Sequence, residues 1–231
     1  MSVTSRSSRP RVSYSYVWII AGVLLGLVVF GAWRLTQNGG QSVVTQTRSV
    51  ASFNAVELAG SNLVTVRVGA RRSVVVRARK NMVGQVTTRV LAGNLVIANT
   101  PSRRGTKGPM SVTVGVPSLT SLTLGLTGSG IINVTGVSAS SLTVKLSGSG
   151  IVRASGTAAR LNVSLGGSGD AELDELVARD AQAVVSGSGR IHITATRSLN
   201  ASVTGYGVIQ YGGNPARLAT SVTGSGVIIP R

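Results

Sequence analysis

Six glycine triplets recur through the second half of the chain at a nearly constant spacing. Five of them read Gly-Ser-Gly and one reads Gly-Tyr-Gly. Their outer glycines are Gly128 and Gly130, Gly148 and Gly150, Gly167 and Gly169, Gly187 and Gly189, Gly205 and Gly207, and Gly224 and Gly226. The spacings of 20, 19, 20, 18 and 19 residues are typical of repeat proteins, in which each unit stacks on its neighbours. We therefore expect a solenoid with coils of about 19 residues.

Apolar side chains alternate with polar ones around each triplet. In the first repeat Leu122, Leu124 and Leu126 precede the triplet, and the later repeats keep these positions apolar except at Thr220. A period of two residues is the pattern of a strand with one buried face. A coil this short has no room for a crossover helix, so equivalent strands must pair in parallel. The sequence predicts an all-β fold, a single-stranded parallel β-helix with the glycine triplets as its structural corners.

The region before the first triplet shows the same alternation in a weaker form. Segments 64–68 and 95–97 alternate, and Gly60-Ser61 reads as the remnant of an older triplet. We expect these early strands to begin and cap the stack. A basic exposed loop is expected over residues 101–109, because proline and glycine punctuate it.

These motifs together resemble a known bacterial family. They are Phe53-x-x-Val56 leading into Gly60, the segment Gly93-Asn94-Leu95-Val96-Ile97, the repeated Leu-x-Val/Leu-x-Leu-x-Gly-Ser-Gly unit, and Gly130-Ile131-Ile132-Asn133. From about Val50 to Ile229 the chain resembles the family called "putative auto-transporter adhesin, head GIN domain". The resemblance implies an envelope-exposed β-helical domain. No membrane domain of the autotransporter type follows Ile229, so we expect periplasmic display from the inner membrane instead of export by that route.

An uncharged apolar segment near the N-terminus predicts a membrane anchor. Residues 12–33 contain no charge and are long enough to cross a hydrocarbon core of ~30 Å as a helix. We expect a short basic cytoplasmic tail over residues 1–15, a transmembrane helix over 16–33, a flexible linker over 34–49 and the solenoid over 50–231. Three arginines precede the helix and one follows it closely, which places the N-terminus in the cytoplasm of a bacterium and the solenoid in the periplasm or outside. A cleaved signal peptide is the alternative, but Phe30-Gly31-Ala32 fits its cleavage pattern poorly.

The charge of the chain is strongly unbalanced. The net charge is +17, and no acidic residue occurs between Leu58 and Gly169. Such a charge attracts polyanions, although a merely solubilising surface is the alternative. The candidate polyanion-binding residues are Arg67, Arg71, Arg72, Arg77, Arg79, Lys80, Arg103, Arg104 and Lys107, with Arg89 nearby. Nucleic acid is not the expected partner, because this tract has no interleaved aromatic residues and lies outside the cytoplasm in the expected topology.

Acidic and basic residues fall into matching positions of successive repeats. Counted from the triplets, Arg153, Glu172 and His192 share one position, and Asp170 and Arg190 share another. Equivalent positions of a parallel stack lie about 4.8 Å apart, so we expect two surface columns. Ion pairing along the columns is the favoured interpretation, because acid–base catalysis requires a pocket with perturbed groups.

The remaining candidates for chemistry are weaker. The chain has no cysteine, which excludes a thiolate metal site. Five acids lie between Asp170 and Asp180 but match no calcium-binding motif, so we interpret them as a solvated patch. The triplet serines repeat too often to be nucleophiles, and Tyr206 either stacks on a sugar or covers an edge. We expect no catalytic residue, cofactor or metal.

The sequence thus predicts a membrane-anchored, non-catalytic module that binds or organises envelope components, with anionic glycan or lipid as its ligand. A purely structural spacer or oligomeric scaffold is the alternative, and a polysaccharide-active β-helix enzyme ranks last. The segment Val227-Ile228-Ile229 leaves a strand edge exposed at the last coil, which predicts a homo-oligomer.

Overall fold

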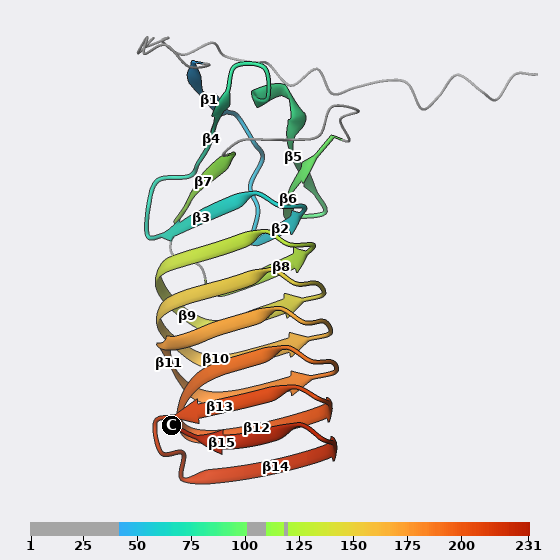
Figure 1. Ribbon diagram of the computed structural model, residues 1–231. Coiled ribbons are helices and arrows are strands. Elements are labelled where there is room, and N and C mark those ends of the chain that lie inside the picture. The colour runs from blue at the N-terminus through green and yellow to red at the C-terminus, as the bar shows by residue number, and fades with distance from the viewer. Residues whose placement is uncertain (1–41, 101–109, 118–119) are drawn as a thin grey trace, which may run out of the picture.

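The computed structural model describes residues 42–100, 110–117 and 120–231, and these residues form strands with one short 3-10 turn (Figure 1). The N-terminal part contains β1 (Val43–Arg48), β2 (Ala55–Ala59), β3 (Leu63–Val68), β4 (Ser73–Arg79), η1 (Val83–Gln85), β5 (Val86–Leu91), β6 (Asn94–Asn99) and β7 (Ser111–Val116). The coils follow as β8 (Ser121–Thr127), β9 (Ile131–Leu146), β10 (Ile151–Leu165), β11 (Asp170–Val185), β12 (Arg190–Gly205), β13 (Val208–Gly212), β14 (Arg217–Gly224) and β15 (Val227–Pro230).

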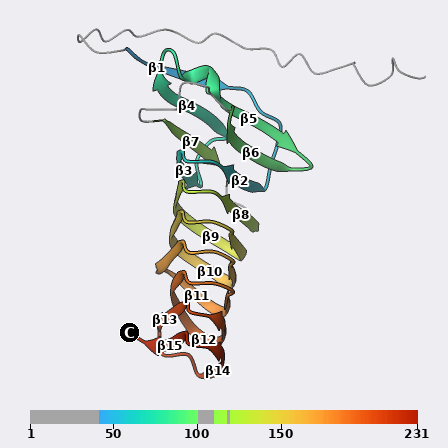
Figure 2. The ribbon, with the colours of Figure 1, turned by 45° about the vertical axis from the view of Figure 1, so that its right-hand side comes forward.

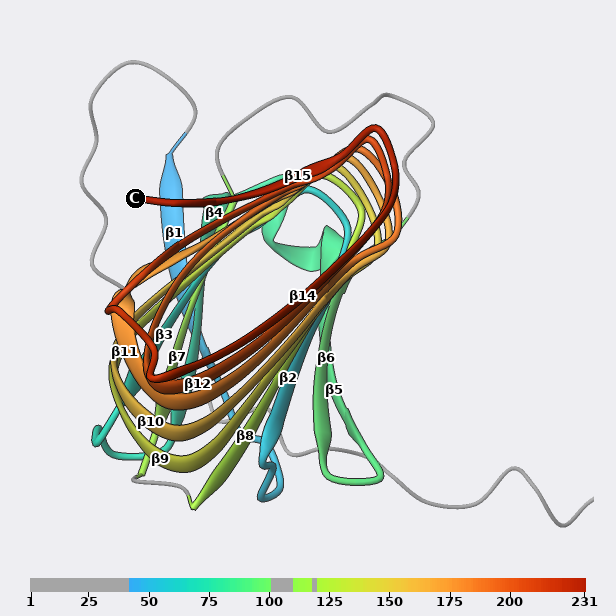
Figure 3. The same cartoon turned by 90° about the horizontal axis from the view of Figure 1, so that it is seen from below.

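Successive coils pair in parallel, which confirms the predicted β-helix. Val163 of β10 lies opposite Val144 of β9 on one side and Ala183 of β11 on the other. The long strands β9 to β12 bend in the middle, so that their two halves belong to two facing layers. Seen along the stack, the coils superimpose as flattened loops (Figure 3).

The core fills the space between the two layers with aliphatic side chains. Leu124, Val144 and Val163 form one inward column and are at most 2% exposed. Burying one such side chain stabilises the fold by about 1.5–3 kcal/mol. The alternation therefore supplies a continuous apolar interior along the stack, as the sequence predicted.

The glycine corners stack backbone against backbone. A Cβ placed on Gly167 would lie 2.3 Å from the carbonyl oxygen of Gly148, and one on Gly169 would lie 2.4 Å from that of Gly150. Neither Gly167 nor Gly169 has a positive φ, so close approach and not backbone chirality requires glycine there. Gly60 lies against Gly128 in the same way, which shows that it belongs to the column of stacked corners.

The N-terminal cap differs from the parallel arrangement expected of it. β2 and β3 do stack in parallel on the first coil, but β4 is antiparallel to both β7 and β1, and β5 and β6 form an antiparallel hairpin (Figure 2). The expected linker over residues 34–49 is wrong at its C-terminal end, because Val43–Arg48 is strand β1. Its residues are mostly β-branched and pair with the otherwise free edge of β4, which explains why they are ordered as a strand.

Arg48 closes the N-terminal end of the core. Its side chain is on the same side of the sheet as inward-facing Val74 and reaches the opposite layer. There its guanidinium donates to the carbonyl oxygens of Val83 at 3.0 Å and Val86 at 2.5 Å. Burial lowers the pKa of Arg48, but a guanidinium stays charged at any physiological pH. Seen along the stack, η1 lies within the outline of the coils at this end (Figure 3).

The expected cytoplasmic tail, transmembrane helix and basic loop over residues 101–109 lie outside the described residues. Within residues 42–100, 110–117 and 120–231, no helix is long and apolar enough to span a membrane.

Two adjacent glycines allow a direct test of corner stacking. We expect Gly167→Ala to lower the free energy of unfolding by about 1–3 kcal/mol, because the new methyl group must displace the backbone of the previous coil. Gly166→Ala is the matched control, since its Cβ would find its nearest atom, the carbonyl oxygen of Leu146, at 4.0 Å. We expect that change to cost less than about 0.5 kcal/mol. Urea unfolding followed by circular dichroism measures both, and equal losses would contradict the stacking argument.

The role of Arg48 can be tested by local stability. Arg48→Met keeps the length of the side chain but leaves the carbonyl groups of Val83 and Val86 without their donor, at a cost of about 1–3 kcal/mol. We expect amide hydrogen exchange to accelerate in β1 and β5 and to stay unchanged in β10 and β11. Arg89→Met, on the exposed side of β5, is the control and should leave both regions unaffected.

Candidate functional site

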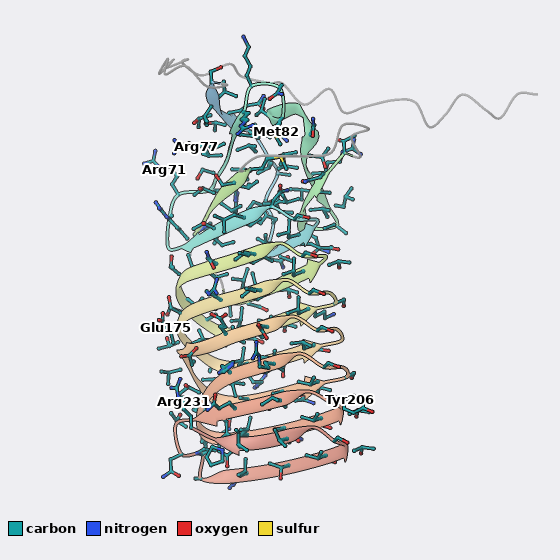
Figure 4. All side chains as sticks on the ribbon, in the orientation of Figure 1. Arg71, Arg77, Met82, Glu175, Tyr206 and Arg231 are labelled. Atoms are coloured by element: carbon teal, nitrogen blue, oxygen red, sulfur yellow. The ribbon has the colours of Figure 1, made fainter. Side chains whose placement is uncertain are left out.

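Four of the predicted polyanion-binding arginines lie together on one layer of the cap. Arg67 is on the outer side of β3 and Arg77 on the outer side of β4, while Arg71 and Arg72 occupy the connection between them. The connection folds back over the sheet, because a Cβ on Gly115, the register partner of Arg67, would lie 2.3 Å from the carbonyl oxygen of Arg71. Figure 4 shows Arg71 and Arg77 on the same side of the cap. We call these four residues the cap cluster.

The other predicted basic residues do not join the cap cluster. Arg79 is half-buried beside Val43 of β1. Lys80 is exposed just beyond the end of β4, where its backbone N–H donates to Ser42, and Arg89 lies on β5 in the other layer. Arg103, Arg104 and Lys107 lie outside the described residues.

The cap cluster is not neutralised locally. All four side chains are exposed, and none forms an ion pair with another described residue. Glu57 is the one acidic residue between residues 42 and 100, and it lies on β2 in the opposite layer. Four like charges on one small surface create a positive potential that extends about 8 Å into physiological salt. This surface can therefore attract anions.

The two predicted surface columns are confirmed in the coils. Arg153 binds Glu172 through two hydrogen bonds, of 2.6 and 3.0 Å, and Arg190 binds Asp170 through two, of 3.1 and 3.3 Å. His192 is the register partner of Glu172, but no described hydrogen bond joins them. Arg153 and Glu172 also line an open hollow of about 510 Å³, where the ion pair occupies both groups.

Sequence reasoning missed the ion pairs of two further acids, Asp180, which pairs with Arg197 and Arg179, and Asp174. Asp180 accepts from Arg197 at 2.7 Å and from the Ser198 hydroxyl at 2.6 Å. The hydrogen bonds from Arg197 and then Ser198 hold the pKa of Asp180 well below its usual range, so it stays ionised. Counting forward from the preceding triplet of each coil misses this contact. The repeat from Gly187 to Gly205 is shortened to 18 residues, which shifts the register between β11 and β12. Counting back from the following triplet would have paired Asp180 with Ser198.

The ion pair of Asp174 joins distant coils. Arg231 reaches back along the outside of the stack to Asp174, with 2.9 Å between Nη1 and Oδ2. Four of the five acids of the patch therefore pair with arginines, while Glu175 is exposed and forms no ion pair with a described residue. Among the described residues, no group of three His, Cys, Asp or Glu side chains could hold a metal ion.

Tyr206 stands on the ridge formed by the triplet corners. It replaces the serine of the other triplets, and 73% of its surface is exposed. Its backbone N–H donates to the carbonyl oxygen of Gly187 in the previous coil, as the N–H groups of Ser149, Ser168, Ser188 and Ser225 do at their corners. The two expectations for Tyr206, stacking on a sugar and covering an edge, both stay predictions.

Several solved structures share the fold of this chain. A "putative adhesin" from Bacteroides fragilis NCTC 9343 aligns with a TM-score of 0.65 and 23% identity, covering 83% of this chain and 98% of that one. A "putative lipid binding protein" and a "putative adhesin" from Parabacteroides distasonis ATCC 8503 align with TM-scores of 0.52 and 0.53 and identities of 20% and 21%, each covering 84% of this chain and 98% of the other.

At these identities the solved structures show a common fold. No curated protein matches the sequence. The family model for "Putative auto-transporter adhesin, head GIN domain" matches residues 52–215, which include most of the cap and of the coils described above. The resemblance seen in the sequence is thus confirmed, and the chain belongs to the family described as "Putative auto-transporter adhesin, head GIN domain".

Proposed function

We propose that the chain is a non-catalytic, adhesin-like module that binds anionic lipid headgroups through the cap cluster. The observation that carries the proposal is the position of an unneutralised basic surface at the end of the solenoid where the chain enters. Arg77 is the register partner of Thr45 in β1, the first strand of the fold. Arg77 therefore lies close to the entry point of the N-terminal segment, and Arg71 and Arg72 lie toward the other end of β1.

The expected membrane anchor relates the position of the cap cluster to lipid binding. In this proposal residues 16–33 span the inner membrane with the N-terminus in the cytoplasm, so residues 34–42 join the bilayer to β1. Nine residues reach at most about 30 Å, which keeps the cap near the membrane surface. Each arginine near an anionic surface contributes about 1 kcal/mol to binding. The "lipid binding" name of one similar structure supports this choice of ligand.

A binding role without catalysis is supported by the state of the acidic groups. Asp170, Glu172, Asp174 and Asp180 each lie in an ion pair with an arginine. A general acid or base must be free to exchange its proton with a substrate. Four of the six acidic side chains of the chain are instead committed to arginines of other coils.

The proposal can be tested with residues 42–231 and lipid vesicles. We expect binding to vesicles of phosphatidylglycerol and phosphatidylcholine, and little binding to phosphatidylcholine alone. Changing Arg67, Arg71, Arg72 and Arg77 together to serine should weaken co-sedimentation at least about tenfold, given about 1 kcal/mol for each arginine.

The matched control removes the same charge from the opposite layer. It changes Arg89, Lys145, Arg160 and Arg217 to serine, four basic residues exposed on the other side of the solenoid. We expect this variant to lose less than about threefold, because its charges lie outside the contact. Equal losses in both variants would mean that net charge alone drives binding. Retention on an acidic polysaccharide without retention on vesicles would replace lipid by glycan as the ligand, and binding to neither would favour a structural spacer.

A further inference from the structure

The last coil leaves the core open. Leu218, Thr220 and Val222 of β14 occupy the inward positions, opposite Leu199, Ala201 and Val203 of β12. The three β12 residues are at most 2% exposed, because β14 covers them. No described strand covers β14 in turn, so Leu218 is 46% and Val222 is 45% exposed. Apolar side chains in core positions are thus presented to solvent.

The two ends of the stack are unlike, which restricts the partner that can cover this one. Arg48 and η1 close the core at the N-terminal end, whereas β14 and β15 end the stack at the other (Figures 1 and 3). Tail-to-head stacking of copies would place the open core against a closed, basic cap. A tail-to-tail contact places one open core against another and ends the assembly at two copies.

The free edge of β14 presents backbone hydrogen-bonding groups for such a contact. The backbone N–H of Ser225, just after β14, donates to the carbonyl oxygen of Gly205 at the end of β12. Because backbone groups alternate in direction along a strand, the odd-numbered residues of β14 direct their N–H and C=O groups toward β12. Leu218, Thr220 and Val222 therefore direct their N–H and C=O groups to the free edge. An antiparallel copy centred on Thr220 would form about six hydrogen bonds at these three positions.

The same register matches the side chains. With Thr220 opposite Thr220 of the second copy, each Leu218 lies opposite a Val222, and the two cores become continuous. The polar residue of the inward column then falls on the two-fold axis, where paired threonine hydroxyls can hydrogen-bond. Arg217 lies opposite a threonine, Thr223, and Arg231 is held by Asp174, so like charges do not meet directly.

The neighbouring edge of β15 is less suited to pairing. The N–H of Val227 donates to the carbonyl oxygen of Gly207, just before β13, and the N–H of Arg231 donates to that of Tyr211 in β13. The backbone N–H positions of residues 228 and 230 therefore face the free edge. Position 230 is proline, which has no N–H to donate. Proline on an edge strand limits the addition of further strands. Of the two edges, β14 is therefore the one that can pair along its length.

We propose that two copies of this chain associate tail to tail, with β14 pairing antiparallel to β14 of the second copy about an axis at Thr220. The contact is small, so it is concentration-dependent and gains strength where many copies share a surface. The two cap clusters then lie at opposite ends of the pair. The self-association itself does not depend on the binding of lipid by the cap cluster.

The absence of cysteine from the natural sequence gives a specific test. Thr220→Cys introduces one thiol, and across the proposed axis two such residues lie about 5.5 Å apart between Cα atoms, within the range of a disulfide. In the full chain in mild detergent, we expect oxidation to crosslink Thr220→Cys at least about tenfold faster than Thr157→Cys, because pairing raises the effective thiol concentration. Thr157 is an exposed threonine of β10 in the middle of the stack and is the matched control.

A second variant separates this contact from association through the N-terminal segment. Thr220→Lys places two like charges on the axis, while the fold is unaffected because Thr220 is exposed. Sedimentation equilibrium should show a concentration-dependent dimer for the original chain and its loss in Thr220→Lys, with unchanged circular dichroism. Equal crosslinking rates for the two cysteine variants, a monomer at every concentration, or a dimer that persists in Thr220→Lys would each overturn the proposal.

Discussion

Contact between the backbones of stacked glycine corners sets the geometry on which the rest of the molecule depends. At Gly148, Gly167 and Gly187 an added Cβ would lie 2.3–2.5 Å from the carbonyl oxygen of the coil before it. No other residue permits this approach, so the corners fix each coil at the distance of a hydrogen-bonded strand from the next. With corner and spacing fixed, the alternation decides which side chains are buried and which form columns. The fold follows from repetition of one local constraint.

That constraint also separates the charges of the chain. Columns bring together residues of neighbouring coils, and they match Glu172 and Asp170 with arginine. Arg197 and Arg231 pair with Asp180 and Asp174 outside these columns. The cap has no comparable columns of acids, because Glu57 is its one acidic residue and faces the other layer. Four carboxylates of the coils are thus neutralised by arginines, whereas the four arginines of the cap cluster have no acidic partner among the described residues. The acidic groups of the coils are therefore mostly held in ion pairs, and the cap cluster is a surface that attracts anions.

The sequence was most informative where the repeat is most regular. The triplets predicted the parallel pairing and the inward residues, and their spacing placed Arg153 beside Glu172. Prediction failed where the repeat changes length, as at Asp180, and where strands pair outside the repeat. β1 is such a strand, since it pairs with β4 through a long-range antiparallel contact that no triplet marks. The arginines of the cap cluster were among the basic residues singled out in the sequence. Only the fold of the cap shows that Arg79 and Arg89 lie apart from them.

A stack of identical coils has no internal reason to stop, so its ends must be specified by residues that break the pattern. At the N-terminal end the break is Arg48, a charged side chain in an inward position whose donors satisfy carbonyl groups across the core. At the other end it is Thr220, a polar residue in an inward column that is otherwise apolar. Arg48 is surrounded by acceptors within its own chain, whereas Thr220 has no layer above it among the described strands. The first break therefore ends the stack, and the second leaves a self-complementary edge for another copy to complete.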